Sequence, residues 1–189
     1  MTNALPLWRG SRPYEQVPFQ WSCHIETAGN GLIHKDFLAS PGLDPRDSCN
    51  NALVELFDGF DGSMVAYNAG FEKRILLALA KAYPSSKDLF ERVCNQSYDL
   101  LPICREHFYH RDMHGSWSIK DVIPAIASDL NYAELAVSNG QSAQEAYLKL
   151  INGGLCEEEA QEIQVGLLRY CKLDTYAMVR IARFFQKQG

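Results

Sequence analysis

The sequence predicts one α/β domain whose second half consists mostly of helices. Three observations lead to this fold class. Residues 19–38 alternate apolar and polar side chains on either side of a turn signal, as two paired strands do. Residues 63–80 have the pattern of a strand, a tight turn and a helix, the unit from which α/β folds are built. Residues 157–185 repeat apolar side chains at steps of three and four, the spacing of one helix face.

The composition is that of a single domain with a full hydrophobic core. The chain has 189 residues, of which 47% are hydrophobic and 22% charged. It has no apolar run near the roughly 20 residues of a membrane helix and no signal-peptide core. Six cysteines without a Cys-x-x-Cys pair predict reduced thiols and a cytoplasmic protein. The net charge of −5 argues against a generally basic, nucleic-acid-coating surface, although not against nucleic-acid contact at one cleft.

The N-terminal half is expected to begin with an irregular segment and a β-hairpin. Three prolines between residues 6 and 18 favour an extended lead-in. Residues 19–26 and 32–38 then form two strands, joined by the turn signal Ala28-Gly29-Asn30-Gly31. After the hairpin, Asp44 is the expected N-cap of a helix that has Pro45 at its first position.

A strand–turn–helix unit and further helices follow. Residues 63–68 form a short apolar strand that leads through a tight turn into a helix over residues 71–80, and residues 87–94 form another helix. Residues 118–121 match a capping box that opens a helix, and residues 142–145 match a second one. Because no repeat or low-complexity linker divides the chain, we expect a single domain over its whole length.

The final helix carries the most informative side chain. Asp174 lies on its apolar face, together with Ile163, Leu167, Tyr170, Met178, Ile181 and Phe185. A carboxylate that faces the interior is costly unless it is paired, hydrogen-bonded or bound to a metal ion. Asp174 is therefore either half of a structural ion pair or an acid that points into a site. Tyr170 lies one turn before it, so hydroxyl and carboxylate can reach a common point.

A second acid, Glu72, follows the expected strand 63–68 at the beginning of a helix. There it either complements the helix dipole or belongs to a site, since α/β folds place ligands at the carboxyl ends of strands. With Tyr170 and Asp174 it gives two carboxylates and one hydroxyl from distant segments. Paired carboxylates hold Mg²⁺ or Mn²⁺ in enzymes that hydrolyse phosphodiesters.

These motifs resemble those of a known superfamily. Asn68-Ala69-x-Phe71-Glu72 is similar to the second motif, and Tyr170-x-x-x-Asp174 to the third motif, of the tyrosine-bearing subtype of DEDD 3′–5′ exonucleases. The chain also resembles an uncharacterised bacterial domain-of-unknown-function family of that superfamily, from Pro6 onward. The further motifs that carry this likeness include Arg12-Pro13-Tyr14, Pro18-Phe19-Gln20, His34-Lys35-x-Phe37-Leu38 and Gly115-Ser116-Trp117-Ser118-Ile119-Lys120.

The resemblance implies an RNase H-like α/β fold, a mixed sheet flanked by helices, and a metal-dependent exonuclease that acts on nucleic acid. It assigns Mg²⁺ or Mn²⁺ to Glu72 and Asp174. It gives Tyr170 the role of orienting the attacking water, since a tyrosine of ordinary pKa near ~10 is a poor base at neutral pH. Asn68 would order the strand end or contact substrate. Lys73 is a candidate phosphate contact beside it.

Two departures from the superfamily pattern affect this expectation. Glu72 stands where the second motif usually has Asp. The first motif, an Asp-x-Glu on the opening strand, has no match, because relatives carry it before the segment that resembles residues 12–20. We therefore expect a fragment of a longer protein that lacks the opening strand and contacts other domains of its parent chain. The alternative is a non-catalytic domain of the same fold that binds nucleic acid or protein.

Three further features have simpler interpretations. Glu26, in His24-Ile25-Glu26, imitates the first motif but belongs by order to the second strand, so we interpret it as a solvated acid. The run Cys104-x-x-His107-x-x-His110-x-x-x-His114 has residue types that suit zinc but a nonstandard spacing, and we interpret it as an aromatic loop with surface histidines. Asp99 is either a helix cap or an acid near the site.

Overall fold

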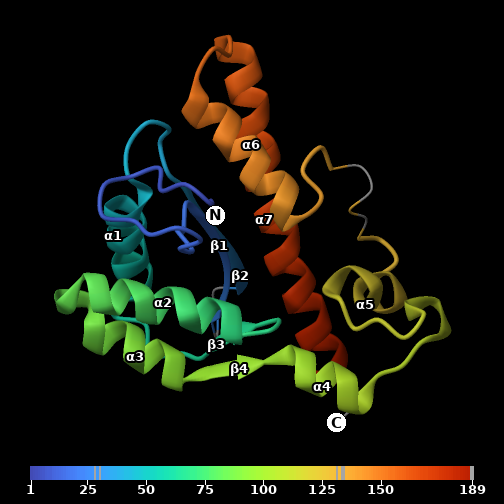
Figure 1. Ribbon diagram of the computed structural model, residues 1–189. Coiled ribbons are helices and arrows are strands. Elements are labelled where there is room, and N and C mark those ends of the chain that lie inside the picture. Colours follow the sequence, from blue (N-terminus) through green and yellow to red (C-terminus); the bar gives the residue numbers. More distant parts are fainter. Residues whose placement is uncertain (28, 30, 131, 133–134, 188–189) are drawn as a thin grey trace.

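Two small sheets lie among helices in the computed structural model of the chain (Figure 1). The structure describes residues 1–27, 29, 31–130, 132 and 135–187. Strand β1 (Gln20–Thr27) pairs antiparallel with β2 (Gly31–Leu38), and β3 (Met64–Ala66) pairs parallel with β4 (Ser97–Asp99). The α/β class is thus confirmed. The expected single mixed sheet is not, because the described strands form two separate two-stranded sheets.

Helices make up most of the remaining regular structure. The α-helices in the described residues are α1 (Pro45–Phe57), α2 (Gly70–Ala82), α3 (Lys87–Asn95), α4 (Leu100–His107), α5 (Ile119–Ile126), α6 (Gly140–Asn152) and α7 (Glu157–Gln186). Two single turns of 3₁₀ helix, η1 (Pro84–Ser86) and η2 (Arg111–Met113), connect them. The predicted helices that correspond to α1, α2, α3 and α7 are confirmed. In the described part of the chain, no helix is both long and apolar enough to cross a membrane.

The hairpin is covered by helices on both faces. Trp21, Cys23 and Ile25 pack into a core cluster with apolar residues of α1, α2 and α3. The intervening side chains of β1 face α7, where Ser22 and His24 hydrogen-bond to Thr175. The predicted hairpin is confirmed, and residues 28 and 30 of its predicted turn lie outside the described residues.

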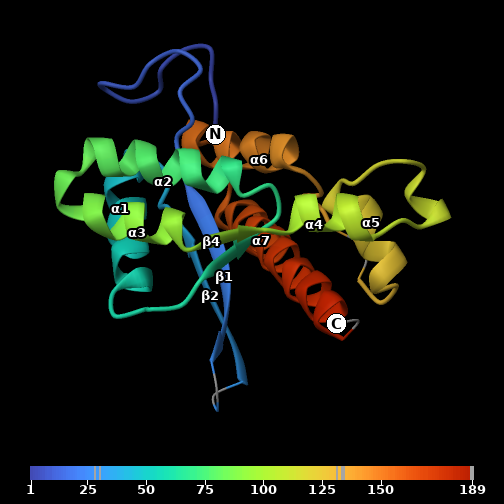
Figure 2. The ribbon, with the colours of Figure 1, turned by 90° about the horizontal axis from the view of Figure 1, so that it is seen from below.

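Helix α7 runs through the second core cluster. Figure 2 shows α7 with the hairpin on one side and α4 and α5 on the other. Leu167, Ala177 and Ile181 of α7 are fully buried. They belong to one cluster with Tyr147 of α6, whose ring stacks on Phe19 at a centroid distance of 4.2 Å. The predicted apolar face of the helix is therefore confirmed, and it packs against both sides of the domain.

The two helices predicted to follow capping boxes are confirmed as α5 and α6, but neither predicted capping box forms. Ser118 precedes α5, but its side chain makes no capping hydrogen bond, and Ser116 Oγ donates to Asp121 at 2.5 Å. Helix α6 begins before the predicted box, and Asn139 is its N-cap. The Asn139 side chain accepts from the Ser142 N–H at 2.8 Å, while Ser142 Oγ accepts from the Asn139 N–H at 3.0 Å. This reciprocal pair satisfies two helix-end donors, so Ser142 is the third residue of the helix and not its cap.

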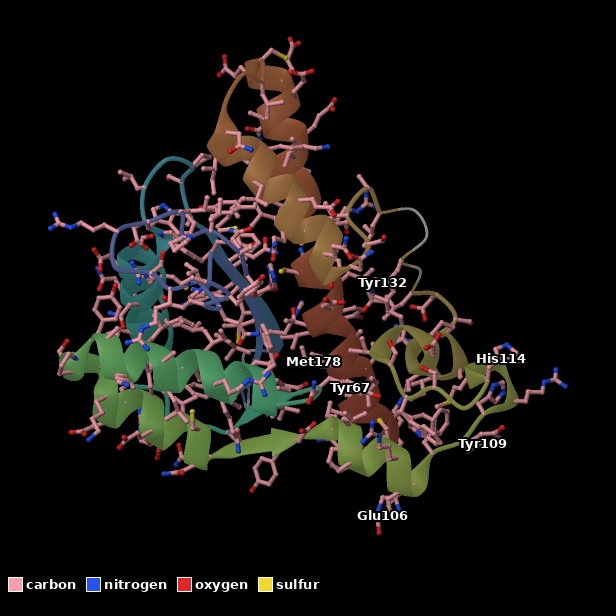
Figure 3. All side chains as sticks on the ribbon, viewed as in Figure 1. Tyr67, Glu106, Tyr109, His114, Tyr132 and Met178 are labelled. Atoms are coloured by element: carbon pink, nitrogen blue, oxygen red, sulfur yellow. The ribbon has the colours of Figure 1, made fainter. Side chains whose placement is uncertain are left out.

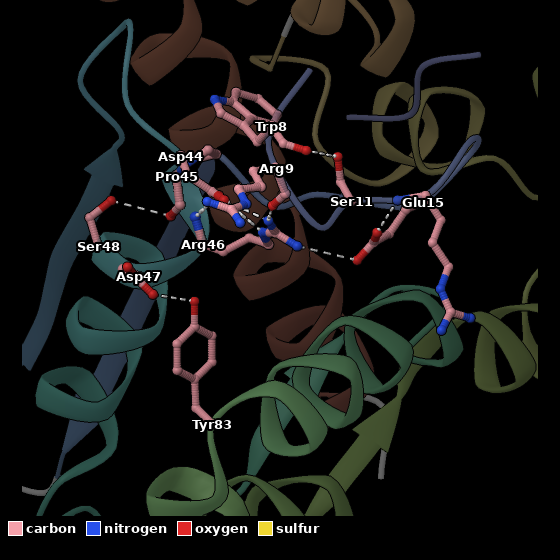
Figure 4. A network of polar contacts seen from close by, with 11 residues as sticks. Trp8, Arg9, Ser11, Glu15, Asp44, Pro45, Arg46, Asp47, Ser48 and Tyr83 are labelled. Atoms are coloured by element: carbon pink, nitrogen blue, oxygen red, sulfur yellow. Dashed lines mark hydrogen bonds and ion pairs between the residues drawn. The ribbon is translucent and has the colours of Figure 1, made fainter. Parts of the chain in front are cut away.

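The irregular N-terminal segment is fixed to the start of α1 (Figure 4). Asp44 caps α1 as predicted, accepting from the Arg46 N–H at 3.0 Å, and its carboxylate also binds the Arg46 guanidinium. That guanidinium donates to the carbonyl of Arg9 at 3.1 Å. The ammonium of Met1 donates to the carbonyl of Val17 at 2.7 Å, which brings the N-terminus beside the beginning of β1.

Candidate functional site

A cleft of about 650 Å³ lies between α7, α1, α2 and the neighbouring strands β1 and β3. Most of the side chains that line it are apolar. Glu72, Tyr170 and Asp174 all line this cleft, although they come from opposite ends of the sequence. Asn68 and Lys73 are not among its lining residues. The structure thus brings together three of the five residues that the sequence suggested for the site.

Asp174 is half-buried in the wall of the cleft and forms no ion pair with the described residues. Its Oδ1 atom is inaccessible to solvent and has no hydrogen-bond partner among the described residues. Burial raises the pKa of Asp174, while the nearby hydroxyls of Tyr170 and Tyr132 and the charge of Lys120 oppose this shift. Because a buried carboxylate oxygen without a partner is unfavourable, a partner for this one atom would stabilise the protein.

Tyr132 and Lys120 complete the surroundings of Asp174, and Figure 3 shows Tyr132 beside α7. The Lys120 ammonium lies 5.6 Å from the ring centroids of both Tyr132 and Tyr170, within the range of cation–π attraction. It also donates to the carbonyl of Ser138. The Lys120 ammonium is therefore engaged by the Ser138 carbonyl and by the two tyrosine rings.

Glu72 occupies the first turn of α2. Its Oε2 atom is buried and has no partner in the described part of the chain. Burial raises the pKa of Glu72, and the negative charge of Asp99 raises it further. Two acids, Glu72 and Asp174, thus line one cleft, and one oxygen of each, Oε2 of Glu72 and Oδ1 of Asp174, makes no hydrogen bond to the described residues.

Asp99 fixes the backbone beside Glu72. Its carboxylate accepts from the backbone N–H groups of Asn68 at 2.9 Å and Ala69 at 3.0 Å. It also caps α4 by accepting from the Leu101 N–H at 2.9 Å. Asn68 is exposed and has φ of 66°, a left-handed conformation that asparagine tolerates better than most residues. The structure gives Asn68 a role in the turn that leads into α2.

The sequence did not reveal a polar network on the β1 wall of the cleft. Thr175 Oγ1 lies 2.8 Å from His24 Nδ1 and 2.9 Å from Ser22 Oγ, which in turn lies 2.9 Å from His34 Nε2. Burial lowers the pKa of His24 to about 4, and the charges of His34 and Lys172 contribute to this shift. The two histidines are direct cross-strand neighbours in the hairpin register. Counting residues outward from Thr27 and Gly31, which flank the turn, would have placed His24 opposite His34.

Glu26 and the run from Cys104 to His114, which the sequence analysis did not assign to a metal site, have the surroundings of structural or surface residues. Glu26 pairs with Arg183 at 2.5 Å. Cys104 is fully buried in the core, where it neighbours the hydroxyl of Tyr67. His114 is exposed and lies far along the domain from Tyr67 (Figure 3). The described residues hold no group of three or more His, Cys, Asp or Glu side chains placed to share a metal ion.

A divalent cation fits this cleft in part. Carboxylate oxygens are the hard donors that Mg²⁺ and Mn²⁺ prefer, and one oxygen each of Glu72 and Asp174 has no partner among the described residues. Two carboxylates alone do not complete a coordination shell, however, and Mg²⁺ usually keeps several water or phosphate ligands. The two acids are therefore candidate ligands of an incomplete site.

Comparison with known proteins gives relatives without an assigned activity. A family model described as "Domain of unknown function (DUF2779)" matches residues 1–118. "Uncharacterized protein MG366" of Mycoplasma genitalium is 25% identical over 206 aligned residues, which cover 98% of this chain and 31% of the relative. The MG366 homolog of Mycoplasma pneumoniae is 28% identical with the same coverage. The chain thus spans about a third of the length of these relatives. No solved structure matches.

Proposed function

Because this chain belongs to the DUF2779 family, a domain of unknown function, we propose its function from its own cleft. The chain is a nuclease domain of the metal-dependent 3′–5′ exonuclease type, with an RNase H-like fold. It acts on nucleic acid as part of a longer protein. One observation carries the proposal. Glu72 and Asp174 line the same cleft, and each has a buried carboxylate oxygen without a partner among the described residues. A divalent cation would offset the cost of burying these charges.

The likeness of the motifs to DEDD exonucleases agrees with this arrangement. Their second and third motifs correspond to Glu72 and to Tyr170 with Asp174, which line one cleft. A divalent cation supplies charge stabilisation for phosphodiester hydrolysis when bound. Free cysteines, including exposed Cys156, agree with the cytoplasmic location that we propose for the protein.

Tyr170 would act as a hydrogen-bond donor and not as a base. Burial raises the pKa of its hydroxyl, and the neighbouring charge of Asp174 raises it further. The hydroxyl therefore keeps its proton at neutral pH and is suited to orienting a water molecule or a phosphate oxygen in the cleft. Asp174 would hold the cation, and Glu72 would bind it from the opposite wall.

A second candidate function is a non-catalytic domain of the same fold that binds nucleic acid or protein. The observation that favours it is the incomplete ligand set, because no third metal-binding side chain lies with Glu72 or Asp174 in the described residues. Under this interpretation Tyr170 and Asp174 shape the cleft and take no part in cleavage.

Digestion of single-stranded DNA and RNA labelled at the 5′ end distinguishes the two candidates. With Mn²⁺ we expect shortening from the 3′ end that is abolished by a chelator and by Asp174→Asn. Tyr170→Phe should reduce the rate, while Glu106→Gln, on the exposed surface of α4 (Figure 3), should not change it. Binding of Mn²⁺ and nucleic acid without cleavage would support the second candidate, and absence of both would contradict the nuclease assignment.

A further inference from the structure

An ion pair between β1 and α7 lies at the wall of the cleft. Arg183 Nη2 donates to Glu26 Oε1 at 2.5 Å, and both residues line the cleft. The side chain of Arg183 is 40% exposed and that of Glu26 is 54% exposed. Ion pairs that are open to water contribute little to stability. A ligand that offers the guanidinium a better partner can therefore replace Glu26 at low cost.

Arg183 is also the one lysine or arginine among the described residues that line the cleft. Three acids line it as well: Glu26, Glu72 and Asp174. In the proposed function a divalent cation offsets the charges of Glu72 and Asp174, and Arg183 offsets the charge of Glu26. Phosphate groups are anions, so they are attracted to the guanidinium and repelled by the acids. Arg183 is thus the positive side chain that the cleft offers to a phosphate group.

The guanidinium of Arg183 keeps most of its hydrogen-bonding capacity. Of the five N–H donors of an arginine, only one on Nη2 bonds to a described residue, and its acceptor is a single oxygen of Glu26. Arg180, three positions earlier on α7, differs, because its Nη1 and Nη2 donate to the two carboxylate oxygens of Asp129 at 2.7 and 2.9 Å. Guanidinium groups bind phosphate through two parallel N–H donors. Arg183 has these donors to offer, whereas those of Arg180 are occupied.

Arg183 lies farther along the wall of the cleft than Asp174. It follows Asp174 by nine positions on α7, which at 1.5 Å per residue is about 14 Å along the helix axis. Nine positions are also about two and a half turns, so the two side chains leave α7 on opposite sides, at the two edges of its cleft wall. The phosphates of one strand of B-DNA follow each other at about 3.4 Å along the axis, so Arg183 lies about four stacked nucleotides from Asp174.

We propose that Arg183 binds a backbone phosphate of a single nucleic-acid strand in the cleft, and that Glu26 is the counter-ion which this phosphate displaces. The inference rests on the nucleic-acid substrate proposed above and adds to it a contact several nucleotides from the two metal-binding acids. In the free protein Glu26 holds the guanidinium at the cleft wall. When a phosphate binds the guanidinium, the exposed carboxylate of Glu26 is released to water.

Binding of a fluorescently labelled single strand of about 12 nucleotides, DNA or RNA, tests the proposal. Fluorescence anisotropy is followed at several salt concentrations in a chelating buffer, so that metal-dependent cleavage does not interfere. Arg183→Gln should weaken binding at least about fivefold and reduce the slope of log affinity against log salt by about 0.7, the contribution of one phosphate contact in a single strand. Arg180→Gln is the matched control and should change neither, because Arg180 does not line the cleft.

A double-mutant cycle tests the displacement of Glu26. Glu26→Gln should strengthen binding about threefold in the native chain, because the guanidinium loses its competing partner, and this gain should shrink in the Arg183→Gln background. If Glu26 only repelled the strand, the gain would be at least as large in that background, since the carboxylate would then be unpaired. That result would overturn the displacement, and equal binding by the native chain and Arg183→Gln would overturn the phosphate contact. A native chain that binds no strand would overturn the whole inference, while Mn²⁺-dependent digestion would still decide the nuclease assignment.

Discussion

Thr175 of α7 and His24 of β1 share a hydrogen bond of 2.8 Å across 151 positions of sequence. The same hydroxyl lies 2.9 Å from Ser22, so one side chain holds the long helix against the middle of the hairpin. Asp174, the residue before it, lines the cleft. The position of the acid therefore depends on the contact between the helix and the strand.

Thr175→Val should destabilise the protein. The substitution keeps the shape of the side chain but leaves Ser22 and His24 without their shared partner, which we expect to lower the free energy of unfolding by about 1–3 kcal/mol. Thr27→Val is the matched control, since Thr27 Oγ1 is buried without a partner among the described residues and its loss should be neutral or favourable. Urea unfolding followed by circular dichroism measures both. Equal effects of the two changes would show that Thr175 is not a structural hub.

Acidification below neutral pH should destabilise the protein through His24. Burial, with contributions from His34 and Lys172, lowers its pKa to about 4 in the folded state, while the unfolded chain has the ordinary value near ~6.5. Between these values the unfolded state binds more protons, so stability rises with pH through this window and is lost as pH falls. His24→Gln should flatten this part of the stability–pH curve. An unchanged slope between pH 6.5 and 4 in the variant would assign the dependence to other groups.

Asp174→Asn should not destabilise the metal-free protein. Burial disfavours the charged carboxylate, whose Oδ1 has no partner among the described residues, so the neutral amide should unfold at an equal or higher temperature. The expected gain is at most about 1–3 kcal/mol. If Asp174 instead formed a structural ion pair with Lys120, the substitution would cost about 3–5 kcal/mol. Thermal melting in a chelating buffer separates these outcomes.

Asp99→Ala should destabilise the turn beside Glu72. Asp99 accepts hydrogen bonds from three backbone N–H groups, two before α2 and one in α4. Their loss should cost roughly 2–3 kcal/mol. Asp61→Ala is the control, because the Asp61 side chain is 91% exposed and its ion pair with Arg92 spans 3.8 Å, for which the expected cost is near zero. Similar melting temperatures for both variants would contradict this role of Asp99.

Local patterns were sufficient to predict much of the fold. Apolar spacing predicted α7, and Asp44 with Pro45 predicted the beginning of α1. Strand β4 was not predicted, because its three residues are too few to show a period and it depends on pairing with β3. The start of α6 was misplaced because Asn139 and Ser142 both have capping side chains, and only the folded backbone decides which one precedes the helix.

The candidate site was predictable only where a motif marked it. Glu72, Tyr170 and Asp174 could be selected from their positions on helices, and they line one cleft. Tyr132 and Lys120 could not, because they approach Asp174 through packing between segments that are distant in sequence. Asn68 and Lys73 were selected for their closeness to Glu72 in sequence. A helix turns by about 100° per residue, so Lys73 does not share the direction of Glu72.

Thermal melting with and without millimolar Mn²⁺ tests the central claim most directly. Ligands that bind only the folded state raise its melting temperature by mass action. The account predicts that Mn²⁺ raises the melting temperature of the native protein, that Asp174→Asn and Glu72→Gln each abolish most of this shift, and that Glu106→Gln keeps it. A melting temperature that does not respond to Mn²⁺, or a shift that survives the loss of both Glu72 and Asp174, would contradict a metal-binding cleft formed by these two acids.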